Sequence, residues 1–115
     1  MTRIVYGSYD DRFYFEATGH AVSEELFDGC GCDGSDESAV CAAISMLVFT
    51  AVERLGEMDR NGDIARLVTE IEDGYACIDA QPRCGYAEAV GEVFSFLMTG
   101  FALLEENHPE LISCE

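Results

Sequence analysis

Two stretches of the chain carry apolar residues at the spacing of an amphipathic helix. In the first, over about 39–55, they recur every three or four positions, and Gly56 stands where a helix would end. In the second, they recur over 90–104, and Asn107-His108-Pro109 closes the pattern. Gly91 and Gly100 interrupt this second stripe, where glycine is expected to permit close packing against a neighbour. The pattern therefore predicts two long helices that pack against a core.

Shorter segments show the alternation typical of strands. Residues 4–6 form a short apolar run, residues 7–11 suit a turn, and apolar and polar positions alternate over 13–18. Asp73-Gly74 separates 64–71 from 75–78 and is a strong hairpin signal. Residues 111–114 can add a last strand. The order is β-hairpin, helix, β-hairpin, helix, final strand, which predicts an α+β domain: one antiparallel sheet covered by two helices.

The composition predicts one folded domain over residues 1–115. Hydrophobic residues make up 49% of the chain and aromatic residues 10%, which argues against an acidic disordered chain. The longest mostly apolar run, 39–52, is shorter than a membrane span, and no signal peptide precedes the first strand. These observations predict a cytoplasmic protein.

The charge is strongly acidic, with 23 acidic against 6 basic residues and a net charge of −17. Such a surface repels phosphates, so we expect no nucleic-acid partner and no binding to an anionic membrane. It attracts basic partners at long range, although acidic residues also serve solubility alone.

The six cysteines are expected to be reduced thiols in a cytoplasmic protein. Their positions give neither a C-x-x-C pair nor a zinc-ribbon spacing. Cys30 and Cys32 flank Gly31, where two thiols could bind a soft metal or oxidise. Incidental thiols in an exposed loop are the simpler interpretation, because no third ligand is evident. We therefore expect no metal and no cofactor.

One thiol and one imidazole form a candidate catalytic pair. If Ser38 caps the first helix, Cys41 lies near the third helical position, where unpaired N–H groups and the helix dipole lower a thiol pKa. His20 follows Gly19 at the end of the second strand, where glycine lets the chain turn and present the imidazole. A cysteine and histidine distant in sequence and close in space are typical of thiol enzymes. A small cysteine in a helix is, however, more often an inert core residue.

The motifs that carry this chemistry also resemble a known family. Gly19-His20-Ala21 at a strand end, an acidic glycine-containing loop, and Val40-Cys41-Ala42-Ala43-Ile44-Ser45 opening an apolar helix are similar to the ribosomal-processing cysteine protease family, Prp. The likeness runs over nearly the whole chain. The loop before Cys41 is longer than in known members, with Cys30-Gly-Cys32-Asp33-Gly34 inserted. Where the family has an aspartate three residues before its cysteine, this chain has Ser38.

The resemblance implies specific roles. His20 and Cys41 match the catalytic histidine and cysteine, Ser45 matches the helix serine, and the loop admits and covers a peptide. The implied substrate is the N-terminal extension of a large-subunit ribosomal protein, and the implied assembly is a homodimer. Asp36 could orient His20 if the loop folds back, and backbone N–H groups around Cys41 are candidates for the oxyanion hole.

Two other functions remain open from the residues alone. The protein could be a non-catalytic acidic module that binds a basic protein segment, in which case the Cys41/His20 pair is a relic. It could also be a redox-responsive or metal-responsive protein that uses Cys30 and Cys32.

Overall fold

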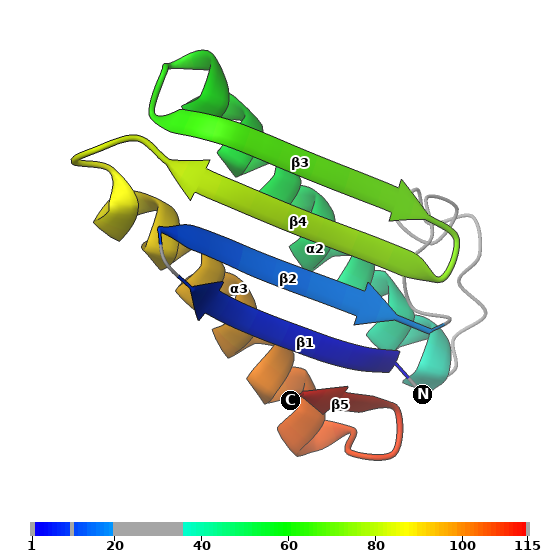
Figure 1. Ribbon diagram of the computed structural model, residues 1–115. Helices are drawn as coiled ribbons and strands as arrows, with labels where there is room; N and C mark the ends of the chain where they lie inside the picture. The colour runs from blue at the N-terminus through cyan, green and yellow to red at the C-terminus, as the bar shows by residue number, and fades with distance from the viewer. Residues whose placement is uncertain (1, 10, 20–35, 115) are drawn as a thin grey trace.

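The computed structural model describes residues 2–9, 11–19 and 36–114, with the side chains of Tyr9 and of residues 36–38 left out of the description. Two helices and a five-stranded sheet form an α+β domain, as the sequence predicts (Figure 1). In chain order the elements are β1 (Thr2–Tyr9), β2 (Arg12–Thr18), α2 (Asp36–Arg60), β3 (Ile64–Glu72), β4 (Tyr75–Pro82), α3 (Ala87–Asn107) and β5 (Ile112–Cys114).

The strands lie in the order β3-β4-β2-β1-β5. The first four are antiparallel to their neighbours, with Phe15 of β2 opposite Ile78 of β4. The short edge strand β5 runs parallel to β1, with Thr2 opposite Ile112. The sheet is therefore antiparallel except at this edge, where the chain returns through α3 and not through a hairpin.

The core lies between the sheet and the helices, both of which cover the same face of the sheet (Figure 1). Alternate residues of β2 and β4 point into it, among them Phe15 and Ile78, which are fully buried. Phe94 and Phe101 of α3 meet them, and the rings of Phe15 and Phe101 stack with centroids 5.3 Å apart. Burial of these apolar side chains stabilises the domain.

Several elements are longer than the sequence pattern predicts. Helix α2 starts at Asp36 and not at residue 39, and it continues past Gly56 to Arg60. Acidic residues at 36 and 37 suit the positive end of the helix dipole, which explains the early start. Met58 is 2% exposed and extends the buried stripe beyond Gly56, which offsets the roughly 1 kcal/mol cost of a helical glycine. Likewise β1 extends to Thr2–Tyr9, so Gly7 lies within a strand.

Both helices contain a segment that is long and apolar enough to cross a membrane, judged by length and composition only: Ala39–Arg60 and Ala87–Asn107. The sequence predicted that the first apolar run is too short to span a membrane. This prediction was wrong about the length of the segment, because α2 continues to Arg60. Core helices of soluble proteins commonly share this composition. Each helix here packs one side against the sheet, through residues such as Val48 and Phe94, which are fully buried.

Candidate functional site

The predicted nucleophile Cys41 lies in the second turn of α2. The helix begins five residues earlier, at Asp36, so Ser38 is inside the helix and is not its N-cap. In an α-helix only the first four N–H groups lack an intrahelical acceptor. The N–H of Cys41 is past that group, and the expected position at the free, positively polarised helix end is wrong. The unpaired amides belong instead to the backbone of about 36–39, which precedes Cys41 by two to five residues, or about 3–7.5 Å along the helix axis.

The side chain of Cys41 is buried at 8% exposure and belongs to the apolar core, beside Val40 and Ile44. Ser45, one turn further along the same side of α2, is fully buried as well. A hydroxyl at such a position requires a hydrogen-bond partner. No buried side-chain nitrogen or oxygen is left without one in the part of the chain that the structure describes. The pair therefore forms a narrow polar strip within an otherwise apolar helix face.

The predicted base His20 and the loop with Cys30 and Cys32 lie outside the described residues. Their immediate neighbours are described. Strand β2 ends at Thr18, and α2 begins at the same end of the sheet (Figure 1). The side chain of Asp36, the proposed histidine-orienting group, also falls outside the description. The end of β2 and the start of α2, which flank residues 20–35 in the chain, therefore lie at the same end of the sheet.

Gly19, the last described residue before His20, is held by the β3–β4 hairpin. Its N–H donates to the carbonyl oxygen of Gly74 at 2.9 Å, one step beyond the final β2–β4 pair, Thr18 and Tyr75. Both glycines have positive φ angles, 129° for Gly19 and 81° for Gly74. The Asp73-Gly74 turn was recognised in the sequence as a hairpin. Its contact with the candidate site was not, because nothing in a linear pattern joins these two segments.

The second histidine, His108, lies between α3 and the edge strand β5. It follows the last turn of α3, where its N–H donates to the carbonyl oxygen of Leu104 at 2.8 Å. Its side chain is half-buried, with Nδ1 at 4.0 Å from a Glu110 carboxylate oxygen. This placement at a helix C-terminus confirms the sequence prediction for His108.

The sheet face opposite the helices carries a polar cluster around Cys77. Tyr14 donates a hydrogen bond to Glu16, which raises the pKa of the Tyr14 hydroxyl well above its usual value. Burial, followed by the nearby Cys77, raises the pKa of Tyr75 to about 12. Burial also raises the pKa of the Cys77 thiol. A raised pKa lowers the fraction of the Cys77 thiol that is ionised at neutral pH.

No metal centre is visible where the structure describes the chain: no three His, Cys, Asp or Glu side chains there could hold an ion together. Cys30 and Cys32 are not among those residues. The metal-binding and redox hypotheses for these two cysteines therefore stay predictions.

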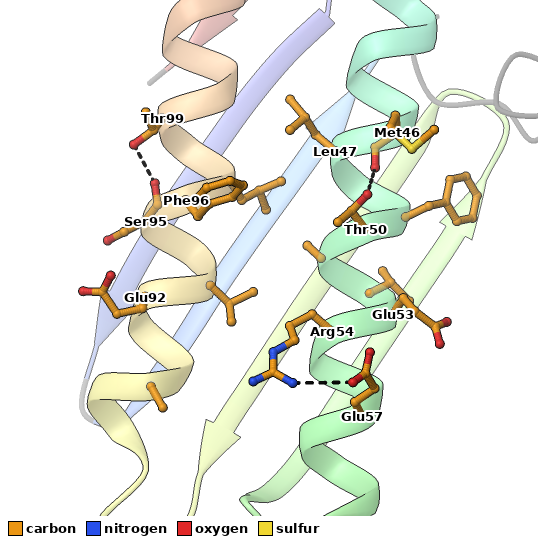
Figure 2. A pocket seen from close by; sticks show the side chains of 16 residues that line it. Met46, Leu47, Thr50, Glu53, Arg54, Glu57, Glu92, Ser95, Phe96 and Thr99 are labelled. Atoms are coloured by element: carbon orange, nitrogen blue, oxygen red, sulfur yellow. Dashed lines mark hydrogen bonds and ion pairs between the residues drawn. The ribbon is translucent and has the colours of Figure 1, made fainter.

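A groove of about 1360 Å³ runs between the outer faces of α2 and α3 (Figure 2). Its walls are mainly apolar, and Phe96 and Met46 are 75% and 52% exposed. Arg54 and three glutamates, Glu53, Glu57 and Glu92, also line the groove. Arg54 Nη1 lies 3.5 Å from Glu57 Oε2. Cys41 does not line this groove. The groove is therefore separate from the candidate nucleophile, and the helical spacing of apolar residues in the sequence did not predict it.

Known proteins match this chain in structure and not in sequence. No protein-family model and no curated protein matches it. SMU.848 from Streptococcus mutans matches with a TM-score of 0.64 at 24% identity, over 100% of this chain and 92% of that one. The essential ribosomal processing protease Prp from S. aureus, in complex with a substrate peptide, matches with a TM-score of 0.66 at 16% identity, over 100% and 98%. The same protease with a covalently linked product peptide matches with a TM-score of 0.66 at 15% identity. The chain therefore shares the fold of these proteins over its full length.

Proposed function

We propose that this protein is a cysteine endopeptidase of the Prp type, with Cys41 as nucleophile and His20 as base. The observation that carries the proposal is the combination of a full-length match to the Prp fold with the sequence motifs at its two flanking elements. Gly19-His20 follows β2, and Cys41 lies in α2, which begins at the same end of the sheet. Neither the fold nor the motifs alone would select a protease.

The reaction proceeds through a thioester. His20 accepts the proton of the Cys41 thiol, and the sulfur attacks the carbonyl carbon of the scissile peptide bond. The C–N bond then breaks, and His20 gives its proton to the leaving amine. A water molecule, deprotonated by His20, attacks the thioester, which releases a carboxylate product and restores the thiol. Because Cys41 lies in the second helical turn, the oxyanion donors are assigned to the free amides near 36–39 or to groups outside the described residues, and not to its own N–H.

We propose as substrate the N-terminal extension of a large-subunit ribosomal protein, cut in the cytoplasm. The resemblance suggests this class of substrate, and the solved Prp structure contains a substrate peptide. The net charge of −17 is suited to a basic ribosomal protein. No cofactor is needed for this chemistry.

The test is direct. The purified protein, its Cys41→Ala and His20→Ala variants and a Cys84→Ala control are incubated with the host's full-length ribosomal protein, and the products are identified by intact mass. Cys84 is an exposed thiol in the turn before α3, so its removal controls for loss of a cysteine as such. We expect one clipped product with the wild type and with Cys84→Ala, and none with the other two. Tight binding without cleavage by all four proteins would favour the acidic binding module.

We also propose that two copies associate through the outer faces of the helices. The resemblance implies a homodimer, and Phe96, Met46 and Leu103 expose apolar side chains on this layer at 75%, 52% and 56%. Sedimentation at increasing salt tests this, since salt screens the repulsion between two acidic copies. Dimers that Phe96→Glu converts to monomers are expected. Monomers at all concentrations would contradict the proposal, and a basic peptide bound in the groove would favour the binding module.

A further inference from the structure

Strand β3 forms a long, largely exposed edge of the sheet. It stands first in the order β3-β4-β2-β1-β5, and β4 is its one partner among the described strands. A bulge between Ile64 and Arg66 disturbs its first residues, but the pairing is regular from Arg66 to Glu72. The opposite edge is shorter and partly capped: β5 has three residues, and its Cys114 N–H donates to a Glu105 carboxylate oxygen at 2.6 Å. A long, regular edge such as β3 is a template for pairing with another extended chain.

The register of the β3–β4 hairpin shows which backbone groups face outward. The turn has two residues, so the pair that closes it, Glu72 and Tyr75, exchanges both hydrogen bonds. Bonded pairs recur at every second residue, and the N–H and C=O groups of the residues between them face away from β4. These outward-facing residues are Leu67, Thr69 and Ile71. The Gly74 carbonyl fits the alternation, because it points to the other side of β4, where it accepts from the Gly19 N–H.

The side chains beside this edge specify the chemistry of a partner. Leu67 and Ile71 pack against the core, so Val68, Glu70 and Glu72 lie on the sheet face opposite the helices, where Val68 is 41% exposed. An added strand would place alternate side chains opposite these three, with Cβ atoms about 5 Å apart. Opposite charges in such pairs are stabilising, so the two glutamates favour Lys or Arg, and Val68 favours an apolar residue. A second copy is less suited, because each copy has a net charge of −17.

We propose that β3 binds an extended basic segment of another protein as a sixth, antiparallel strand. Antiparallel pairing follows from the three neighbouring pairs of the sheet, which are all antiparallel. In its own chain direction the segment carries a basic residue opposite Glu72, a second opposite Glu70 and an apolar residue opposite Val68, each separated by one residue. Hydrogen bonds between the backbones supply the affinity, and the alternate side chains supply the specificity.

The first test uses the synthetic peptide Thr-Lys-Thr-Lys-Thr-Val-Thr and the full chain with Cys41→Ala, so that cleavage cannot intervene. Binding is measured by NMR titration at low salt. N-methylation of the third and fifth peptide residues removes N–H groups that face β3 and should weaken binding about tenfold. N-methylation of the second and fourth residues, whose N–H groups face away, should leave the affinity within about threefold. Equal affinities of the two methylated peptides, or no binding of the unmodified peptide, would overturn the proposal.

The second test changes the edge itself. The Thr69 N–H faces outward, so Thr69→Pro blocks strand addition without removing a bond to β4, and proline is tolerated at such edge positions. We expect about a tenfold loss of peptide affinity, whereas Thr69→Ala, which keeps the N–H, should bind as wild type does. Reversing both charges, with Glu70→Lys and Glu72→Lys, should also weaken binding about tenfold at low salt, and Glu88→Lys on α3 is the control. Wild-type affinity in Thr69→Pro would overturn the proposal. If that variant does not fold, the methylated peptides decide.

Other occupants of the edge give different results. Dimers that Thr69→Pro abolishes and Phe96→Glu leaves intact would assign the edge to a second copy and overturn the proposal. That the natural occupant is the substrate rests on the proposed function, and β3 ends at the end of the sheet where α2 begins (Figure 1). Thr69→Pro should then raise the KM of cleavage about tenfold. If wild type and Cys41→Ala are equally inactive, the proposed function fails, and peptide binding alone decides whether β3 is a docking edge.

Discussion

Gly100 of α3 lies directly against Leu47 of α2. A Cβ added to Gly100 would be 2.8 Å from Leu47 Cδ2 and 2.9 Å from Cδ1, closer than carbon atoms pack. The glycine thus admits the leucine side chain between the helices. Leu47 is only partly buried and lines the groove, so its end can rotate outward.

Gly100→Ala should therefore change stability little in the wild-type background. The gain in helix propensity, about 1 kcal/mol, is offset by displacement of Leu47. In a Leu47→Ala background the same substitution should stabilise the protein by about 1 kcal/mol, measured by denaturant unfolding. Gly56→Ala serves as control, since a Cβ there meets only Arg60 Nη1 at 3.5 Å. Equal effects of Gly100→Ala in both backgrounds would show that the two residues are not coupled.

Gly91→Ala should be more costly than Gly100→Ala. A Cβ at Gly91 lies 3.0 Å from Phe13 Cζ, and that ring stacks on Phe94 with centroids 5.5 Å apart. An aromatic ring held by a second ring cannot rotate away as a leucine end can. We expect a net loss of about 1–2 kcal/mol in the free energy of unfolding. The near-ultraviolet circular dichroism spectrum of the aromatic residues should also change. A stabilised Gly91→Ala would mean that Phe13 moves freely.

Arg12 of β2 and Asp79 of β4 form an ion pair across the exposed sheet face. Two hydrogen bonds join them, one from Arg12 Nε to Asp79 Oδ1 at 3.2 Å and a second from Nη2 to Oδ2. A partly exposed bidentate pair contributes up to about 1 kcal/mol. Arg12→Lys should lose most of this contribution, because a single ammonium cannot make the paired contact. A double-mutant cycle with Asp79→Asn, at low and high salt, measures it, and a coupling energy of zero would refute the prediction.

The fold was predictable because its signals are local. The helical spacing of apolar residues predicted both helices, and the Asp73-Gly74 pair predicted the hairpin of β3 and β4. The start of α2 was missed because residues 36–38 are polar, and an apolar stripe says nothing about a polar first turn. The parallel pairing of β5 was missed because three residues carry no information on strand direction.

The candidate site was predictable only in part, for a related reason. Motif spacing in the sequence pointed to Cys41, and the structure places it in α2 beside Ser45. The contact between Gly19 and Gly74 joins residues far apart in the chain, and the groove depends on which faces of two helices turn outward. Such relations arise only from the packed structure. Whether His20 lies against Cys41 stays a prediction.

Substitution of Cys41 should separate its packing from its chemistry. The side chain is 8% exposed in an apolar environment, so Cys41→Ala loses one buried atom and about 1 kcal/mol of stability. Cys41→Ser places a hydroxyl in the same buried position and should lose more, by about 1 kcal/mol, because a hydroxyl costs more to remove from water than a thiol. Thermal unfolding of both variants tests this order. Equal stability of the serine variant and the wild type would show a polar, hydrated surrounding, in better agreement with an accessible nucleophile than with a dry core.

The polar cluster on the open sheet face should make the fold sensitive to alkali. Burial raises the pKa of Tyr75 from 10.0 to about 12 in the folded protein. A neutral phenol is therefore favoured by folding: its contribution is complete below pH 10 and is lost as the pH rises from 10 towards 12. The free energy of unfolding should fall over this range, and Tyr75→Phe should reduce the slope. Tyr86→Phe, at an exposed residue before α3, is the control and should leave it unchanged. If Tyr75→Phe and Tyr86→Phe show the same slope from pH 10 to 12, ionisation of Tyr75 is not what limits alkaline stability.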